Sequence, residues 1–296
     1  MKIKKTASMR AFECMAYVIL GGLSIACVIP FILIITSSFS SSESIARYGY
    51  QLIPNELSLE GYRLIFQGYK DLVRAYGVTI YTTVIGTFAS VLMNAVAGYV
   101  LSRKEFRYRN TLSFLFYIGG FITGGLIPTY YLWAGVFNMR GTLTVLWLPG
   151  LVSSFYIILM RTFTASNLPD SITDAAKIDG ASQWVIFYKV ALPVLKPALA
   201  TVGLFAALGY WNSWLPSSLY STDSSTWQLQ FYLQNIINKQ NAMEMLARET
   251  GIMVGEMPKE SMKMAMAVVA TGPIILLYPF VQKYFVSGIT IGSVKG

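Results

Sequence analysis

The sequence contains no histidine and only two cysteines among its 296 residues. A metal site of the Cys/His type is therefore excluded. Cys14 and Cys27 lie thirteen residues apart in or beside one apolar run. At about 100° of rotation per residue they fall on different faces of a helix, which makes a disulfide between them implausible. The sequence predicts no metal centre, no cofactor and no disulfide framework.

Charge is also scarce, because Asp, Glu, Lys and Arg make up 12% of the chain and hydrophobic residues 54%. In soluble proteins about a quarter of all residues are charged. This composition indicates an integral membrane protein. The net charge of +9 does not predict nucleic-acid binding, because the basic residues are not gathered into one tract with interleaved aromatics.

Six uncharged stretches are long enough to cross the apolar core of a bilayer, which needs about 20 helical residues. No alternating strand pattern accompanies them. We therefore predict an all-α integral membrane protein with six transmembrane helices. The first stretch is too long for a signal peptide and is interpreted as a retained anchor. The six run approximately over residues 15–36, 76–101, 111–133, 142–160, 198–216 and 264–282.

The excess of positive charge lies on one side of these spans. The N-terminus, the second and fourth loops and the C-terminal tail carry all of it, whereas the first, third and fifth loops are balanced. The positive-inside rule places the first set in the cytoplasm. We therefore predict cytoplasmic termini, at 1–14 and 285–296, around a six-span domain at 15–284. A long extracytoplasmic loop is expected at 217–263, where amphipathic-helix spacing relates Leu229, Tyr232, Leu233, Ile236 and Ile237.

None of the six predicted spans contains Asp, Glu, Lys or Arg. Proton relays and intramembrane catalysis usually depend on such groups, so we do not expect this chain to be an enzyme. Two rival interpretations stay open. One is a self-sufficient, ion-coupled carrier of a small solute, using carbonyls of helices broken at prolines. The other is a membrane-bound enzyme, which the missing acid pairs and histidines disfavour.

One loop differs from the rest in its polarity. Residues 174–197, DAAKIDGASQWVIFYKVALPVLKP, hold five charged residues between apolar runs. Ser171, three residues before Asp174, predicts a capping-box-like helix start, and Gly180 can close that helix in the left-handed conformation. A second short helix is expected to end at Pro193. One face of the pair is apolar, as on a lipid surface or in a docking site, through Ile178, Ala181, Trp184, Val185 and Tyr188.

These residues carry a resemblance to a family. Asp174-Ala175-Ala176 and Asp179-Gly180-Ala181, followed by Phe187, Leu192-Pro193 and Pro197, resemble the EAA loop of permease subunits of bacterial ABC importers. YWNSW at 210–214 and the ending YPFVQKYFVSGITIGSVKG at 278–296 extend it over essentially the whole chain. The ending resembles the carbohydrate-type permeases of the LplC and YtcP kind, related to the MalG type. Asp174 stands where the motif usually has Glu, which leaves its ion-pair partner open.

The resemblance implies a MetI-like, non-catalytic permease subunit of an ATP-driven importer of sugars or oligosaccharides in the bacterial cytoplasmic membrane. Its implied partners are a sister permease, two cytoplasmic ATPase subunits and an extracytoplasmic sugar-binding protein, with membrane lipid around it. The sequence has no G-x-x-x-x-G-K-[ST] loop, which agrees with ATP binding on another chain.

Two segments are implied to contact the ATPase. The EAA loop, residues 165–197, corresponds to coupling helices that transmit its movement. The implied contacts in it are Asp174, Ala175, Ala176, Asp179, Gly180, Ala181 and Trp184. The implied contacts in the tail are Gly292, Ser293, Val294, Lys295 and Gly296.

Four residues within the spans are candidates for the substrate path. Asn94 and Asn212 either line a solute path or form interhelical hydrogen bonds, which is the commoner role. Tyr210 and Trp211 either stack on a sugar ring or belong to the interfacial aromatic belt. The sequence does not choose between these interpretations.

Overall fold

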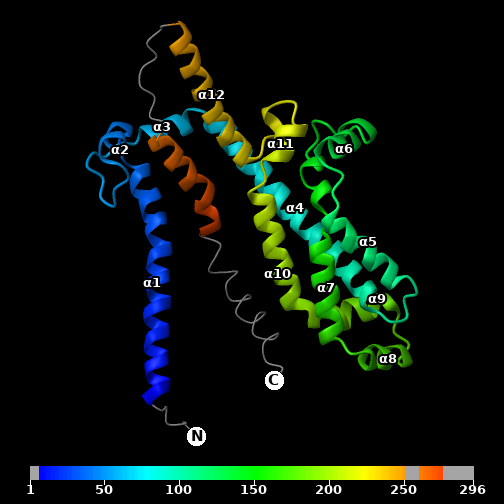
Figure 1. Ribbon diagram of the computed structural model, residues 1–296. Coiled ribbons are helices and arrows are strands. Elements are labelled where there is room, and N and C mark those ends of the chain that lie inside the picture. The colour runs from blue at the N-terminus through cyan, green and yellow to red at the C-terminus, as the bar shows by residue number, and fades with distance from the viewer. Residues whose placement is uncertain (1–6, 251–259, 276–296) are drawn as a thin grey trace. The chain divides into compact units, whose positions relative to one another are not determined.

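The computed structural model describes residues 7–250 and 260–275, and these residues are predominantly helical (Figure 1). Within them there is no β-strand, and the one isolated bridge joins Ser40 and Leu57. The prediction of an all-α protein is confirmed. The end of the sixth predicted span and the tail residues Gly292 to Gly296 lie outside the described residues.

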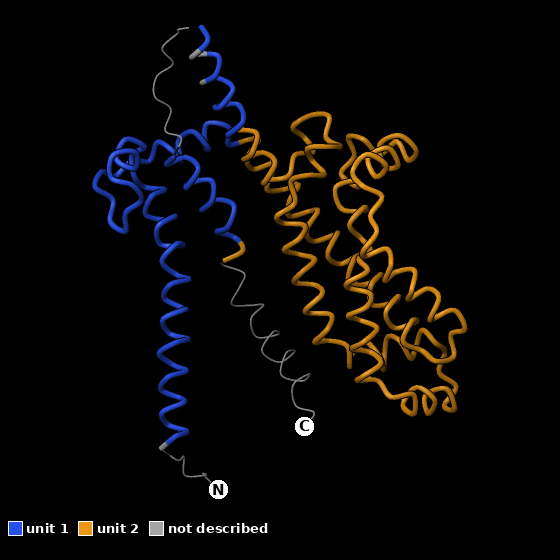
Figure 2. The backbone as a smooth tube through the Cα atoms, viewed as in Figure 1, with its two compact units in different colours: residues 1–69, 237–273 blue, residues 70–236, 274–296 orange. Residues whose placement is uncertain are grey.

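The chain divides into two compact units, residues 1–69 with 237–273 and residues 70–236 with 274–296 (Figure 2). The first unit contains the helical residues 260–273 and the end of α12. Its other helices are α1 (Ala7–Ser38), α2 (Ser42–Tyr48) and α3 (Glu60–Gln67).

The first unit is held together where α3 meets residues 260–275. A Cβ atom at Gly61 would lie 2.9 Å from backbone atoms of Ser261 and Met262, so only glycine allows this approach. The Ser42 hydroxyl accepts a hydrogen bond from the Ser261 amide at 3.3 Å. Gln240 of α12 donates to the sulfur of Met262 at 3.0 Å, which ties a third element to the same place.

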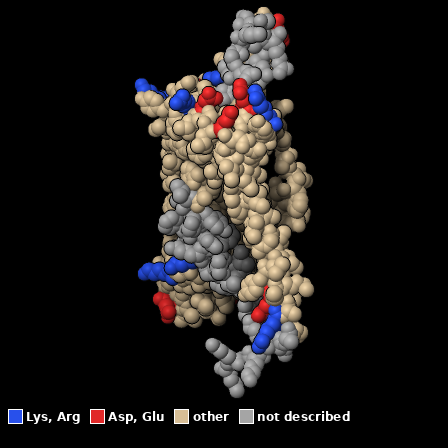
Figure 3. All heavy atoms as spheres, turned by 90° about the vertical axis from the view of Figure 1, so that its left-hand side faces the viewer, with Lys and Arg blue, Asp and Glu red and all other residues tan. Residues whose placement is uncertain are grey.

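The first predicted span is the 32-residue helix α1. Its charged residues, Arg10 and Glu13, lie near its start, and none follows up to Ser38. Large apolar side chains face outward along it, including Ile19 and Leu20. In Figure 3, the part of α1 above the charged side chains at its lower end is drawn without Lys, Arg, Asp or Glu. Such a surface suits the hydrocarbon core of a bilayer.

The second unit begins within α4 (Tyr69–Ser102) and ends within α12 (Leu229–Thr250). Between them follow α5 (Arg109–Phe121), α6 (Leu126–Tyr130), the π-helix η1 (Tyr131–Val136), the 3₁₀-helices η2 (Thr144–Leu146) and η3 (Leu148–Gly150), α7 (Ser154–Asn167), α8 (Asp170–Ile178), α9 (Gln183–Val185), the π-helix η4 (Ile186–Ala191), α10 (Leu192–Trp211), α11 (Leu215–Tyr220) and the 3₁₀-helix η5 (Ser224–Thr226).

Three described helices are long and apolar enough to cross a membrane: Ser8–Ser38, Tyr69–Ser102 and Gln183–Trp211. The third and fourth predicted spans each correspond to two helical segments that meet at a bend. α5 meets the following helical segment at 114°, and the η2–η3 segment meets α7 at 51°.

The two bends are stabilised in different ways. Gly125 adopts a φ of +86° directly before α6, a conformation that glycine allows and other residues disfavour. At the second bend, the non-helical residues before α7 need partners for their backbone groups. Asn94 of α4 accepts a hydrogen bond from the Ser153 amide at 3.1 Å and donates one to the Leu151 carbonyl at 3.0 Å. These two backbone groups therefore have hydrogen-bond partners although they lie outside a helix.

The fifth span starts earlier than predicted, because the helix before it does not end at Pro193. α9, η4 and α10 form one helix over Gln183–Trp211, which passes through Pro193 and Pro197. The π-helical turn comes directly before α10, where the Leu192 amide bonds to the Phe187 carbonyl, five residues back. This wider turn accommodates the missing amide and bulky ring of Pro193, so the helix continues.

The amphipathic helix predicted in the fifth loop is present as α12. Leu229, Tyr232 and Leu233 are buried. Its first turn is fixed by a buried polar network, in which Thr79 of α4 accepts from the Leu229 amide at 2.7 Å and Ser217 accepts from the Gln228 amide at 2.9 Å. The start of this loop is therefore part of the packed unit.

Candidate functional site

The candidate loop begins with α8, which starts at Asp170 after Pro169. Ser171 lies within the helix and Pro169 makes no side-chain cap, so the predicted capping-box start at Ser171 is wrong. Asp170 occupies the first turn and Lys177 the last. Each charge faces the helix end of opposite partial charge, which stabilises a helix this short.

The end of α8 is the glycine turn that the sequence predicts. Gly180 has a φ of +80°. Its amide donates to the Lys177 carbonyl at 2.9 Å, and the Ala181 amide donates to the Ala176 carbonyl at 2.9 Å. These two bonds make a Schellman motif, which closes a helix and reverses the chain. A residue with a side chain at Gly180 would be strained by the positive φ. It would not be strained by a clash, because no atom lies within 4 Å of a Cβ placed there.

After the turn, the Ser182 side chain accepts from the Val185 amide at 3.4 Å and caps the next helix. That helix is not the second short helix expected from the sequence, because it continues into α10. The loop is therefore one short helix joined by a glycine turn to the end of a long one.

The inner side of this segment packs on a buried core. Ile186 and Phe187 are almost fully buried, and the Phe187 ring lies 5.2 Å from the Tyr99 ring of α4. Ala176 and Ala181, two of the predicted contact residues, are partly buried against the same cluster. These two alanines therefore help to pack the loop onto the core, and other side chains form its outer surface.

The outer side carries exposed apolar groups next to acids. Ile178 is 88% exposed and Trp184 63% exposed. The Trp184 ring stacks on Tyr188 at a centroid distance of 6.2 Å. Asp174, Ala175, Asp179 and Gly180 are exposed as well. Five of the seven residues predicted from the EAA-like motif therefore lie on this outer surface, in the part of the chain that the structure describes.

Charged side chains around α8 are paired within the unit. Lys104 donates to Asp170 at 2.9 Å, and this hydrogen bond lowers the pKa of the Asp170 carboxyl. Lys177 binds Glu105 and also lies 3.4 Å from Asp174. The bond to Glu105 raises the pKa of Lys177. Asp174, whose partner the sequence left open, thus has an intramolecular partner one turn away.

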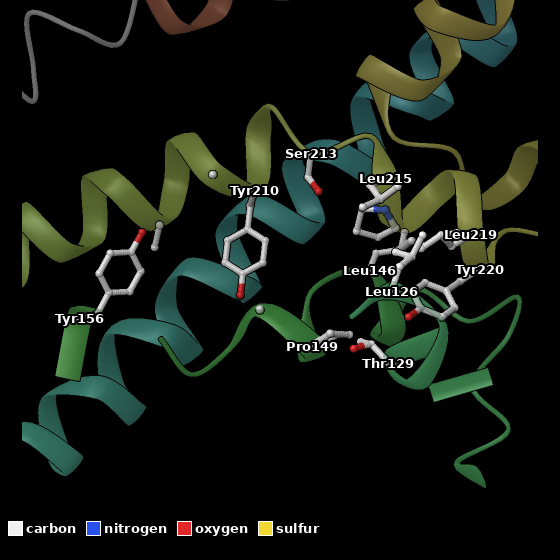
Figure 4. Close-up of a pocket in the computed structure, with 14 residues that line it drawn as sticks. Leu126, Thr129, Leu146, Pro149, Tyr156, Tyr210, Ser213, Leu215, Leu219 and Tyr220 are labelled. Atoms are coloured by element: carbon white, nitrogen blue, oxygen red, sulfur yellow. The ribbon is translucent and has the colours of Figure 1, made fainter. Parts of the chain in front are cut away.

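A separate pocket of about 330 Å³ lies beside α10. Figure 4 shows Tyr210 pointing from α10 toward the segment that carries Pro149. The Tyr210 hydroxyl donates to the Trp147 carbonyl at 3.0 Å. The pocket is lined mainly by apolar groups, from Leu126, Thr129, Leu146, Pro149, Gly150, Tyr156, Ala206, Gly209, Tyr210, Ser213, Leu215, Pro216, Leu219 and Tyr220.

The other three candidates for the path are placed differently. Trp211 is buried, with its ring 6.5 Å from that of Tyr76. Asn212 is exposed, and its amide donates to the Leu208 carbonyl at 3.0 Å. Asn94 is fully buried and bonds between α4 and the residues before α7. Tyr210 is the one of these four side chains that lines the pocket.

Comparison with known proteins identifies the kind of molecule. Residues 96–291 match the family described as binding-protein-dependent transport system inner membrane component. The chain belongs to this family. As a whole, this permease is 38% identical over 293 residues to the polygalacturonan/rhamnogalacturonan transport system permease protein YtcP of Bacillus subtilis (strain 168). That match covers 97% of this chain and 99% of the relative.

Two further comparisons span nearly the whole permease. It is 34% identical over 295 residues to Protein LplC of the same organism, which covers 98% of this chain and 97% of the relative. A chain in the crystal structure of a bacterial ABC transporter involved in the import of the acidic polysaccharide alginate has a TM-score of 0.77 and 28% identity, covering 96% of this chain and 100% of that chain. The resemblance drawn from the EAA-like loop and the chain ending is confirmed.

Proposed function

We propose that this permease imports oligosaccharides as a non-enzymatic subunit of an ATP-driven transporter. It forms the translocation path with a sister permease and couples to two cytoplasmic ATPase subunits. Two similar proteins are named for transport of polygalacturonan/rhamnogalacturonan and of arabinooligosaccharides, and a similar structure for import of alginate. These names support an oligosaccharide as the substrate, delivered by an extracytoplasmic binding protein.

The observation that carries the coupling role is the outer surface of α8 and α9. Ile178 and Trp184 expose apolar area beside the acids Asp174 and Asp179, on a segment whose inner side is packed. Burying an isoleucine side chain contributes roughly 1.5 to 3 kcal/mol, and tryptophan is a frequent anchor of interfaces. A rigid segment with an apolar outer surface suits a partner that pushes on it.

The remaining proposals concern orientation and the tail. The charge asymmetry supports cytoplasmic termini, with α8 on the cytoplasmic side and α11 and α12 outside. The tail, Gly292 to Gly296, is proposed as a second ATPase contact because its glycines permit close backbone approach. We propose that the Tyr210 ring, which borders the pocket, lines the substrate path. Trp211 and Asn212 are proposed to lie at the edge of that path.

The coupling proposal is tested by comparing two isoleucines that are similarly exposed but lie in different parts of the chain. Ile178 is 88% exposed and Ile53, in the first loop, is 80% exposed. In the reconstituted complex, Ile178→Asp is expected to lose the ATPase on purification and to lose oligosaccharide-stimulated ATP hydrolysis, whereas Ile53→Asp keeps both. Undiminished coupling in Ile178→Asp contradicts the docking surface.

The orientation is tested in a variant without the exposed Cys14 and Cys27. Single cysteines next to Lys104 or at Gly180 are expected to react only from the cytoplasmic side, and one at Ser224 only from outside. Labelling of the Gly180 position in intact cells by an impermeant reagent refutes the proposed topology. Transport by this chain alone, driven by an ion gradient in ATP-free liposomes, favours the secondary carrier instead.

A further inference from the structure

Arg103, directly after α4, is a largely buried arginine that contacts α8 and Leu168, two residues before that helix. Its side chain is 11% exposed. Nη2 donates to the Leu168 carbonyl at 3.3 Å, and Nη1 donates to the Thr173 hydroxyl at 3.4 Å. Nη1 also lies 3.7 Å from an Asp170 carboxylate oxygen. The fork of one guanidinium thus reaches three groups at the start of α8, which a lysine ammonium does not reproduce.

The two residues after Arg103 also bind α8. Lys104 pairs with Asp170 in its first turn at 2.9 Å, and Glu105 pairs with Lys177 in its last turn. Consecutive residues 103–105 therefore hold both ends of the helix. Thr173, on the side of α8 that faces Arg103, is 3% exposed, so this contact is packed as well as charged.

The end of α4 is itself fixed to its neighbour. Nε of Arg161, in α7, donates to the Leu101 carbonyl at 3.2 Å. The Arg103 guanidinium lies 5.2 Å from the ring centroid of Tyr99, which is buried in the core cluster. Force applied to α8 through residues 103–105 therefore reaches α4 by short, packed contacts, in addition to the covalent route through Gly180 into α10.

We infer that Arg103, Lys104 and Glu105 are a positioning clamp that joins α8 to α4, so that movement of the ATPase is delivered directly to the second span. The inference rests on the proposed coupling function. It adds a direct route by which movement passes from α8 to α4, because in this inference α8 and the end of α4 move as one body throughout the transport cycle. A coupling segment that hinges on Gly180 alone separates from residues 103–105 when it moves.

The first test separates the guanidinium fork from its charge. Arg103→Lys is expected to lower transport per ATP hydrolysed by about 2- to 30-fold, the range in which single residues modulate coupling. ATPase co-purification stays unchanged. Arg107→Lys is the matched control, because Arg107 lies over the Tyr108 ring, 5.8 Å from its centroid, and is exposed. A transport-to-hydrolysis ratio that stays unchanged in Arg103→Lys overturns the role of the fork.

The second test uses the pair at the other end of α8. Glu105→Lys and Lys177→Glu are each expected to lower the transport-to-hydrolysis ratio, and the double exchange is expected to restore it. General damage to the fold does not predict this rescue. Failure of the exchange to restore the ratio, when both single variants lower it, overturns the ionic contact as part of the clamp.

The decisive test links the two segments covalently. Cysteines at Glu105 and Lys177, in a background with Cys14→Ser and Cys27→Ser, are joined by a short bifunctional maleimide. The unlinked double variant lacks the Glu105–Lys177 pair, so its transport-to-hydrolysis ratio is expected to be lowered. If α8 and α4 move together, linking raises the ratio toward that of the wild type, whereas a ratio that falls further on linking overturns the clamp. Absence of any stimulation in the wild-type complex contradicts the proposed function itself, so the two failures are distinguishable.

Discussion

Gly98 and Gly180 belong to the same unit, but the chain needs glycine at them for different reasons. At Gly98, in the contact between α4 and α7, a Cβ atom would lie 2.5 Å from the Met160 Cβ and 2.8 Å from the Arg161 nitrogen. At Gly180, after α8, a Cβ atom would meet nothing within 4 Å, and the φ of +80° is what requires glycine. The first region depends on space and the second on backbone conformation.

This difference separates stability from coupling. The contact between α4 and α7 includes Met160 and Asn94, which are fully buried, so a change there acts on the whole packed unit. The turn after α8 is exposed and carries outward-facing side chains. A change there therefore alters the orientation of the surface that α8 presents. Four experiments can break or sharpen the comparison.

The largest expected effect is that of Gly98→Ala. Because the added methyl meets Met160 and the backbone of Arg161, the helices must separate, at a cost of about 3 kcal/mol, the upper end of typical overpacking. Thermal denaturation of the purified permease measures it. The control is Gly77→Ala in the same helix, where a Cβ meets nothing within 4 Å. Equal stability of the two variants contradicts the tight contact.

The next effect is that of Asn94→Ala, at the same contact. Removal of the amide leaves the Ser153 amide and the Leu151 carbonyl without this partner, which costs about 1 to 3 kcal/mol. We expect lower thermal stability and an unchanged KM for the transported oligosaccharide. A changed KM with unchanged stability would return Asn94 to the substrate path.

A smaller effect on stability, with a larger one on coupling, is expected for Gly180→Val. The left-handed conformation costs a residue with a side chain about 1 to 2 kcal/mol, and relief of this strain re-aims α8. The denaturation temperature changes little, whereas oligosaccharide-stimulated hydrolysis is lost. Gly180→Asn is the control, since asparagine tolerates this conformation better. Full stimulation in Gly180→Val argues against the docking role of the turn.

The smallest effect is that of pH on the contacts of α8. The pKa of Asp170 is lowered, so its contribution is present above the unfolded pKa and is lost only as pH falls through the lowered value. The pKa of Lys177 is raised, so its contribution is present below the unfolded pKa and is lost as pH rises through the raised value. The activity ratio of wild type to Asp170→Asn is therefore expected to stay constant from about pH 6 to 8.5. A ratio that changes in this range points to a different titrating group.

Local chemistry made part of this permease predictable. Long uncharged runs mark helices for the bilayer because an unpaired charge there is costly. Gly180 marks the end of α8 because the left-handed conformation is a property of a single residue. The same reasoning misplaced the start of α8 and ended the following helix at Pro193. In that case the π-helical turn over Ile186–Ala191 accommodates the proline, and packing of Phe187 on Tyr99 accompanies it.

The sequence by itself determined the all-α class, the apolar runs, the charge asymmetry and the EAA-like loop, since each depends on residues close together in the chain. The tertiary structure alone decided how Asn94 bonds the residues at the bend in the fourth predicted span, and the need for glycine at position 98. It also decided the contacts of Arg103, which in the sequence is one basic residue among several after a span. Its partners Asp170 and Thr173 lie more than sixty residues away, and only folding brings them within reach of its guanidinium.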